Sequence, residues 1–195
     1  MINPKLLKPK VMKELSSGFK ENNPQGVQVQ GFMDAESYKK FLAVIANVKF
    51  KKSEVRDTHS FFEANHAALE FFNSKEFLSF ASVVTGKKLT KAECTLKIFL
   101  AGSYTLLHDN PNDNPKRGIE LYFDFTPGWK AEWGGATFFV TKEGEKLMIP
   151  PAPNTLVIAE ARRSYVKYVN KLAWGEGRLV VSGTLKCQNF PSVYD

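Results

Sequence analysis

The chain has little cysteine and little histidine, with two cysteines and three histidines among 195 residues. Cys94 and Cys187 lie in separate apolar stretches without the spacing of metal ligands. They are interpreted as reduced core residues, and a single disulfide between them is the alternative. Long apolar runs are also missing: the longest, such as residues 156–159, have the length of a strand, which argues against a membrane-spanning helix. No apolar signal-peptide segment follows Met1, so a cytoplasmic location is expected.

Apolar and aromatic side chains are abundant instead. Hydrophobic residues make up 43% of the chain and aromatic residues 13%, and sixteen residues are phenylalanine. This composition is sufficient for a single domain over residues 1–195 with a sizeable core. Periodicity is weak over residues 1–30, which are expected to form a partly mobile N-terminal segment.

The net charge is +7, from 27 Lys and Arg against 20 Asp and Glu. Such a balance can attract an anionic partner, including nucleic acid. The basic residues are spread along the chain, however, and no run interleaves them with aromatic residues in an RNA-binding signature. A solvated basic surface is therefore favoured over a nucleic-acid site, which stays as an alternative.

Helical signals fill residues 31–92, which are expected to form a helical support. Asp34 is placed to cap a helix in which apolar residues recur at helical spacing from Tyr38 to Ile45. Residues 60–72, rich in Phe, Ala, Leu and Glu, are a second candidate helix. Ser74 caps a third, which Gly86 ends.

Strand signals replace helical ones over residues 93–187. Short apolar segments alternate with clusters of Gly, Pro, Asn and Asp, the expected strands being 95–101, 119–125, 136–141, 146–149, 155–159, 165–169 and 179–185. This spacing predicts a mainly β fold with N-terminal helices, a sandwich or jelly roll.

One histidine has a position that suggests metal chemistry. His108 ends the apolar run Leu106-Leu107-His108, Asn110 follows two residues later, and Arg178 opens a later strand. A non-haem iron pocket is laid out in this way, with two histidines and one carboxylate on one face of the metal. Here an amide stands at the carboxylate position, and no histidine lies in the later strands. The sequence predicts an oxygenase-like scaffold with an incomplete metal site.

Residues from about 77 to 185 resemble the prolyl-hydroxylase-like branch of the 2-oxoglutarate/Fe(II)-dependent oxygenases, and most closely the group that hydroxylates a proline of a ribosomal protein. The matching pieces, in order, are residues 77–86, Tyr104-Thr105-Leu106-Leu107-His108, residues 122–129, Glu132-Trp133-Gly134-Gly135, residues 150–157 and Arg178-Leu179-Val180-Val181-Ser182-Gly183. The resemblance implies a double-stranded β-helix, a cupin-like jelly roll, with a pocket between its two sheets.

The resemblance also assigns the metal positions. His108 falls on the first ligand histidine and Asn110 on the ligand carboxylate. Where the family has Ser-aromatic-His, this chain reads Ser164-Tyr165-Val166, so Val166 falls on the second histidine. A neutral amide and an alkyl group replace an anion and an imidazole, which degrades the site.

The positions that bind the co-substrate 2-oxoglutarate match the family more closely than the metal positions do. Arg178 falls on the arginine that pairs with the distal carboxylate of 2-oxoglutarate, Ser182 lies on the same strand face, and Phe99 replaces a tyrosine that often lines the co-substrate pocket. Arg178 with Ser182 could hold a dicarboxylate without metal. The alternative is that Arg178 pairs with an internal acid such as Glu120 or Asp124.

Three residues are candidate substitutes for the missing ligands. Asp113 lies in a proline-bounded loop that could bring it to the metal. His59 and His66 are seven residues apart, a spacing that puts them on one face of a helix, and surface or core-edge positions are the simpler interpretation. His108 itself has a plain alternative as a core histidine.

Three classes of function follow. The favoured one is a pseudo-oxygenase that binds a protein or another ligand. The second is an active 2-oxoglutarate oxygenase with an unorthodox metal site, which would use Fe(II) and 2-oxoglutarate. The third is a basic module for nucleic acid or another polyanion.

Overall fold

The computed structural model describes residues 1–22, 25–55, 59–108, 119–141, 146–160, 165–169 and 177–188, and at 107–108, 141, 146–147 and 165–169 only the backbone. No helix within these ranges is long and apolar enough to cross a membrane. The helices and strands are α1 Pro9–Glu21, β1 Gly26–Gln30, α2 Ala35–Ile45, β2 Lys51–Val55, β3 His59–Ala64, α3 Lys75–Thr85, β4 Leu89–Phe99, β5 Tyr104–His108, β6 Ile119–Asp124, β7 Thr137–Thr141, β8 Lys146–Ile149, β9 Thr155–Glu160, β10 Tyr165–Val169 and β11 Arg178–Cys187.

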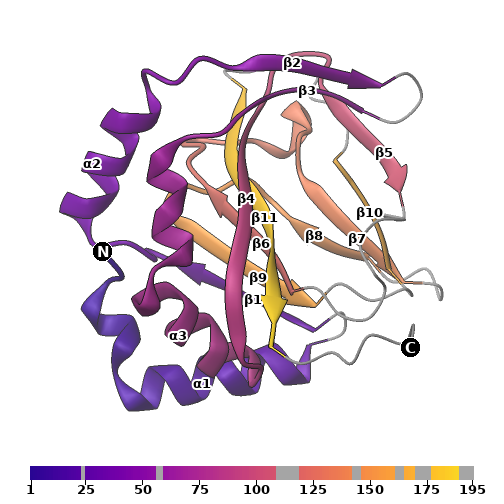
Figure 1. Cartoon of the computed structure of the whole chain (residues 1–195). Coiled ribbons are helices and arrows are strands. Elements are labelled where there is room, and N and C mark those ends of the chain that lie inside the picture. Colours follow the sequence, from indigo (N-terminus) through magenta and orange to yellow (C-terminus); the bar gives the residue numbers. More distant parts are fainter. Residues whose placement is uncertain are drawn as a thin grey trace, which may run out of the picture.

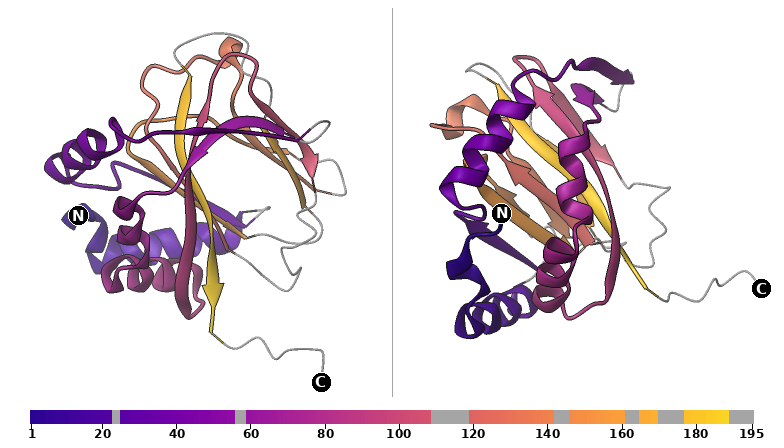
Figure 2. Two further views of the ribbon diagram at one scale, coloured as in Figure 1. Left: turned by 45° about the horizontal axis from the view of Figure 1, so that its top comes forward. Right: turned by 60° about the vertical axis from the view of Figure 1, so that its left-hand side comes forward.

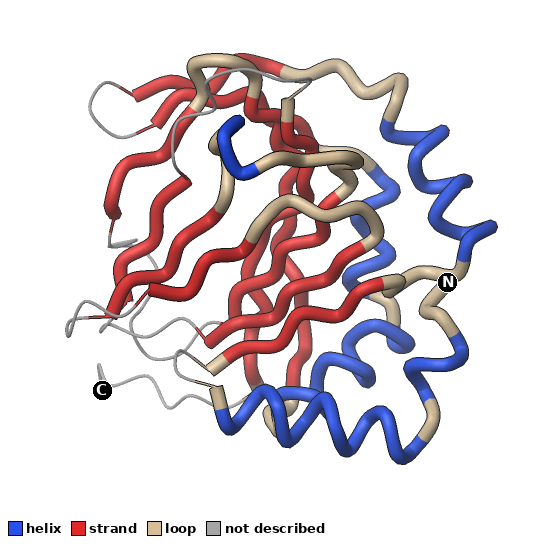
Figure 3. Tube along the Cα trace, turned by 180° about the vertical axis from the view of Figure 1, so that it is seen from behind, coloured by secondary structure: helices blue, strands red, loops and turns tan. Residues whose placement is uncertain are grey.

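The strands form one curved sheet in the order β1-β9-β6-β11-β4-β3-β5-β10-β7-β8, and β2 pairs with β3. Each of these pairings is antiparallel. Figures 1 and 3 show the sheet bending so that the β5-β10-β7-β8 part lies against the part that contains β6 and β11. The predicted jelly roll, a double-stranded β-helix, is therefore confirmed.

The three α-helices gather on one outer face of this sheet (Figure 2). A large aromatic core lies between them and the sheet, in which Phe32, Phe72, Phe77 and Phe123 are all fully buried. Their rings meet mostly edge to face, the favourable arrangement for aromatic pairs. The abundance of phenylalanine thus has a structural explanation.

The opposite face, here called the inner face of the sheet, carries a second and smaller core. It combines Phe61, Phe99, Tyr122 and Val180 from one part of the sheet with Phe139 from β7 in the other part. Because both parts contribute to the same cluster, the two parts of the sheet pack against one another.

Capping residues in the sequence correctly predicted where two helices begin. The Asp34 carboxylate accepts a hydrogen bond from the Ser37 amide at 2.8 Å and caps α2. The Ser74 hydroxyl accepts one from the Phe77 amide at 3.2 Å and caps α3, which ends at Gly86 with a left-handed φ of 69°.

The helix predicted over residues 60–72 is wrong. Residues 59–64 form strand β3, which pairs with β2 on one side and β4 and β5 on the other, and a 3-10 helix follows over Ala67–Asn73. The region 31–92 is therefore not helical throughout. Two further elements within residues 1–30 were not expected, β1 and α1, although Met12, Leu15 and Phe19 follow helical spacing.

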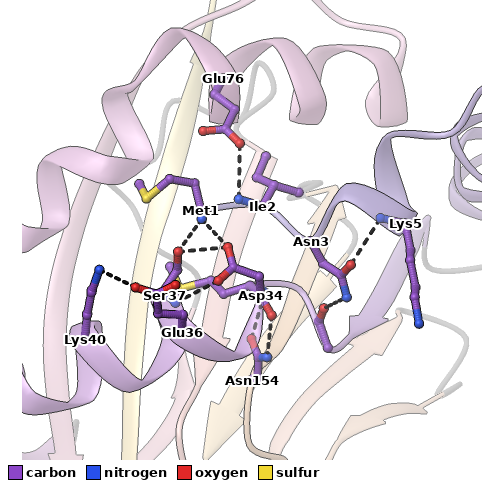
Figure 4. A network of polar contacts seen from close by, with 12 residues as sticks. Met1, Ile2, Asn3, Lys5, Asp34, Glu36, Ser37, Lys40, Glu76 and Asn154 are labelled. Atoms are coloured by element: carbon purple, nitrogen blue, oxygen red, sulfur yellow. Dashed lines mark hydrogen bonds and ion pairs between the residues drawn. The ribbon is translucent and has the colours of Figure 1, made fainter.

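The first residues pack against the helices and the turn before β9 (Figure 4). The Ile2 amide donates to the Glu76 carboxylate at 3.1 Å, and the Ile2 side chain is buried. Asn154 donates to the Met33 carbonyl and accepts from the Met33 amide, both at 2.8 Å. The Met1 amine contacts the Asp34 carboxylate. The Asn154–Met33 bonds join residues 121 positions apart in sequence, and the Ile2–Glu76 bond joins residues 74 positions apart.

Candidate functional site

Arg178 is the most highly buried charged residue of the inner face, with 1% of its surface exposed. It opens β11, which lies between β4 and β6. Its Nε donates to the Asp124 Oδ2 at 2.7 Å, and its Nη1 donates to the Gly135 carbonyl and the Thr137 hydroxyl, each at 2.8 Å. One side chain thus connects β11 to β6 and to the start of β7 across the fold.

The segment before β7 is shaped to bring a carbonyl to Arg178. Gly134 and Gly135 have φ values of 76° and 80°, which residues other than glycine rarely adopt. The Trp129 indole donates to the Gly134 carbonyl at 2.7 Å, and the Trp133 ring packs against the inner core cluster. The Gly-Gly pair and the two tryptophans therefore hold the chain where Gly135 can accept from the guanidinium.

Both carboxylate oxygens of Asp124 accept hydrogen bonds. Besides the bond from Arg178, its Oδ1 accepts from the Thr126 amide at 2.8 Å, and the Thr126 hydroxyl accepts from the Leu179 amide at 3.2 Å. Asp124 is itself almost fully buried. Of the two interpretations of Arg178, pairing with an internal acid is thus the one that the structure shows, with Asp124 as the partner.

The guanidinium retains one group without a partner. Among the described residues, no acceptor lies within hydrogen-bonding distance of the buried Arg178 Nη2. Buried N–H groups nearly always have partners, so this nitrogen marks a place where a ligand oxygen could bind.

Ser182 and Phe99 also lie on the inner face. In the antiparallel ladders Phe99 is opposite Arg178, and Ser182 is opposite Tyr122, and directly opposed residues share a face. The Tyr122 hydroxyl donates to the buried Glu120 carboxylate. Neither position is tested for co-substrate binding, so that role of Phe99 and Ser182 stays a prediction.

The expected metal positions are described only in part. His108 is the last residue of β5, and Val166 lies in β10, while Asn110 and Asp113 lie outside the described residues. β10 pairs with β5, and the backbone register sets Lys167 opposite His108 and Val166 opposite Val140 of β7. The strand that the resemblance assigns to the second ligand is therefore the neighbour of the strand that carries His108.

The other two histidines do not share a helix face, and that expectation is wrong because the helix does not form. His59 lies in β3, where its Nε2 is 3.1 Å from the Ser53 hydroxyl and its ring stacks on Phe61. His66 precedes the 3-10 helix, and its Nδ1 accepts from the Ala68 amide at 3.0 Å. Both have local structural roles.

The described residues contain no group of three or more His, Cys, Asp and Glu side chains arranged to hold a metal ion. Both cysteines are free thiols. Burial, with smaller contributions from Glu70 and Glu93, raises the pKa of the Cys94 thiol to about 12, and burial also raises the pKa of Cys187. The interpretation of the cysteines as reduced residues agrees with this.

Sequence reasoning missed Gly135 and Thr137 as partners of Arg178. The Gly-Gly pair was a visible signal, because two consecutive glycines mark an unusual backbone. It also missed Lys97, which lies opposite Val180 on the inner face with its ammonium 4.5 Å from the centre of the Phe61 ring. A lysine between apolar strand residues carried no signal that distinguished it from a surface residue.

No protein-family model matches the chain. A segment of 79 residues, 40% of this chain, is 30% identical to the mouse (Mus musculus) prolyl 3-hydroxylase OGFOD1, of which it spans only 14%. The match therefore concerns a small part of that protein.

Solved structures match over most of the chain. A prolyl-4-hydroxylase from Pseudomonas putida has a TM-score of 0.72 at 14% identity, covering 91% of this chain and 99% of that one. A prolyl hydroxylase from Trichoplax adhaerens, in complex with a peptide fragment of the hypoxia inducible factor oxygen degradation domain, has a TM-score of 0.73 at 13% identity, covering 95% and 93%. A 2OG-Fe(II) oxygenase family oxidoreductase from Burkholderia pseudomallei has a TM-score of 0.73 at 13% identity, covering 91% and 92%. The chain thus has the prolyl-hydroxylase-like fold of the 2-oxoglutarate/Fe(II) oxygenases.

Proposed function

We propose that this protein is a pseudo-oxygenase: it uses the oxygenase fold to bind a protein or another ligand and does not catalyse oxidation. The observation that carries the proposal is the composition of β10, the strand that pairs with β5 at His108. Strand β10, which pairs with β5, reads Tyr165-Val166-Lys167-Tyr168-Val169 and contains no histidine, acid or cysteine. Whichever residue of β10 approaches His108, the strand therefore supplies no imidazole or carboxylate.

The residues do not fit an iron ion for a second reason. Asn110 offers a neutral carbonyl oxygen where the family has a carboxylate. One imidazole and one amide are a weak ligand set for a labile divalent cation, which needs several anionic or imidazole donors to compete with water. The alternative of an active oxygenase requires a ligand from outside β5 and β10, and Asp113 is the candidate for it.

The state of Arg178 also supports binding without turnover. In the resemblance this arginine balances the charge of a 2-oxoglutarate carboxylate. Here the Asp124 carboxylate, 2.7 Å from Nε, already balances it. A dicarboxylate would have to bind beside a buried acid, which is unfavourable at low dielectric.

A protein is the partner class that we infer. The Trichoplax adhaerens structure holds a peptide fragment, so this fold can bind a peptide. The net charge of +7 favours an acidic partner at long range. Nucleic acid is the alternative, and its binding would fall steeply with salt concentration.

Metal binding tests the proposal directly. Titration of the metal-free protein with Mn(II), a redox-stable substitute for Fe(II), should give no specific binding at micromolar concentration. His108→Ala is the matched control, and it should behave as the wild type does. Tight binding of one equivalent that disappears in His108→Ala would overturn the proposal and would direct the search for a further ligand to Asp113.

A further inference from the structure

The charges of the inner face favour one kind of ligand over another. Arg178 on β11 and Lys97 on the neighbouring β4 lie on this face, and the exposed Lys91, Glu93 and Lys186 pair with one another further along it. Three acids lie near Arg178 and Lys97: Asp124 and Glu120 on β6, placed by their opposition to Val180 and Thr184, and Glu63, which is opposite Lys97 on one side and Lys51 on the other. At Arg178 itself, the buried Asp124 carboxylate already compensates the positive charge that a dianion would need.

Two of the three guanidinium nitrogens of Arg178 donate hydrogen bonds to the protein. Nε is bonded to Asp124, and Nη1 to Gly135 and Thr137. Only Nη2 lacks an acceptor among the described residues, although the whole side chain is buried. The site therefore still offers N–H donors after its charge has been compensated.

We propose that Asp124 determines the specificity of this site, by making Arg178 Nη2 select an uncharged carbonyl oxygen, such as that of an amide or peptide group, over a carboxylate. A neutral acceptor satisfies the donor without adding charge. A carboxylate at Nη2 would lie next to Asp124, and the repulsion between two acids on one guanidinium is strong in a buried environment. The inference rests on the proposed function, since it assumes that the fold binds a ligand without iron.

A matched pair of small molecules tests the selectivity. Glutarate carries a distal carboxylate, and glutaramate carries an amide in its place while the rest of the molecule is the same. Each is titrated into the protein by NMR in the presence of EDTA, so that metal does not contribute. The wild type should bind the amide about tenfold more tightly than the dicarboxylate.

Asp124→Asn should reverse this order, because the variant removes the built-in counter-ion and leaves the arginine in need of an anion. Glu70→Gln is the control, since it removes one negative charge from an exposed position on the 3-10 helix. It should leave the preference unchanged. Where Asp124→Asn does not fold, Arg178→Lys provides the readout: it keeps a cation beside Asp124 but lacks Nη2, so binding of the amide should fall about tenfold.

The proposal is overturned if the wild type prefers the dicarboxylate, if Asp124→Asn folds and keeps the wild-type order, or if neither molecule binds at millimolar concentration. These outcomes are independent of the metal titration. Specific Mn(II) binding would overturn the proposed function while leaving the preference at Arg178 to be decided by the titrations in EDTA.

Discussion

Arg178 and Asp124 form a buried ion pair whose members depend on each other. Removing one partner of such a pair leaves the other charge buried without compensation, whereas replacing both with apolar residues is often tolerated. The same arginine also holds Gly135 and Thr137 of the opposite part of the sheet. Its loss should therefore weaken the packing of the two parts as well.

Arg178→Ala should lower the free energy of unfolding by about 3–5 kcal/mol, because Asp124 is left as an unpaired buried acid. Urea denaturation measures the change. The double variant Arg178→Met with Asp124→Leu is the control and should recover most of the lost stability. A small effect of Arg178→Ala on its own would show that the pair is not buried as described.

Cys94 provides a second prediction for a single residue. Its pKa of about 12 leaves only about one molecule in ten thousand as thiolate at pH 8, and the thiolate is the reactive form. In a Cys187→Ser variant, Ellman's reagent should therefore label Cys94 slowly in the folded protein and rapidly in urea. Rapid labelling without urea would contradict the burial of this thiol.

At the scale of helices and strands, the elements with local signals were predictable. Asp34, Ser74 and Gly86 mark helix ends by short-range hydrogen bonds and backbone conformation, which the sequence displays directly. Residues 59–64 do not alternate cleanly, since Phe61 and Phe62 are adjacent. They form a strand because β2, β4 and β5 lie beside them, and those neighbours are not visible in a local pattern.

The hydrogen bond that caps α3 can be tested separately. Ser74→Ala removes the acceptor for the Phe77 amide and should cost about 1 kcal/mol of stability. Ser79→Ala makes the same chemical change on the exposed side of the same helix and should cost little. Equal effects of the two substitutions on the urea midpoint would argue against the capping bond.

The assignment of β10 can be tested by rebuilding the metal site. Asn110→Asp with Val166→His should gain affinity for Mn(II), because it restores a carboxylate and a second imidazole at the positions that the resemblance assigns. Asn110→Asp with Lys167→His is the comparison, since the backbone register sets Lys167 opposite His108. A gain only in the Lys167 variant would show that the motif was aligned one residue away from the ligand position.

At the scale of the whole molecule, the jelly roll could be predicted from the order of short strands and the ordered motifs. The pairing of Arg178 with Asp124 could only be offered as one of several options. The two residues are 54 positions apart and meet because β6 and β11 are neighbours. Strand order depends on the packing of the complete sheet, which a local sequence pattern does not contain.

The helical layer and the inner face contribute differently to stability and to ligand binding. The large aromatic core between the helices and the sheet supplies most of the apolar burial. The inner face holds the buried Arg178–Asp124 ion pair and, among the described residues, the one buried side-chain donor without a partner. Any ligand-binding role is therefore expected on the inner face, where polar groups are retained at a cost in stability.

Formation of succinate from 2-oxoglutarate in the presence of Fe(II), ascorbate and oxygen decides whether this protein is a pseudo-oxygenase or an active enzyme. The expected result is no succinate above the level of a protein-free control, with or without added peptide, because β10 and Asn110 supply neither the second imidazole nor the carboxylate that would hold iron beside His108. Turnover that is lost in His108→Ala would contradict it and would show that the protein is an active oxygenase.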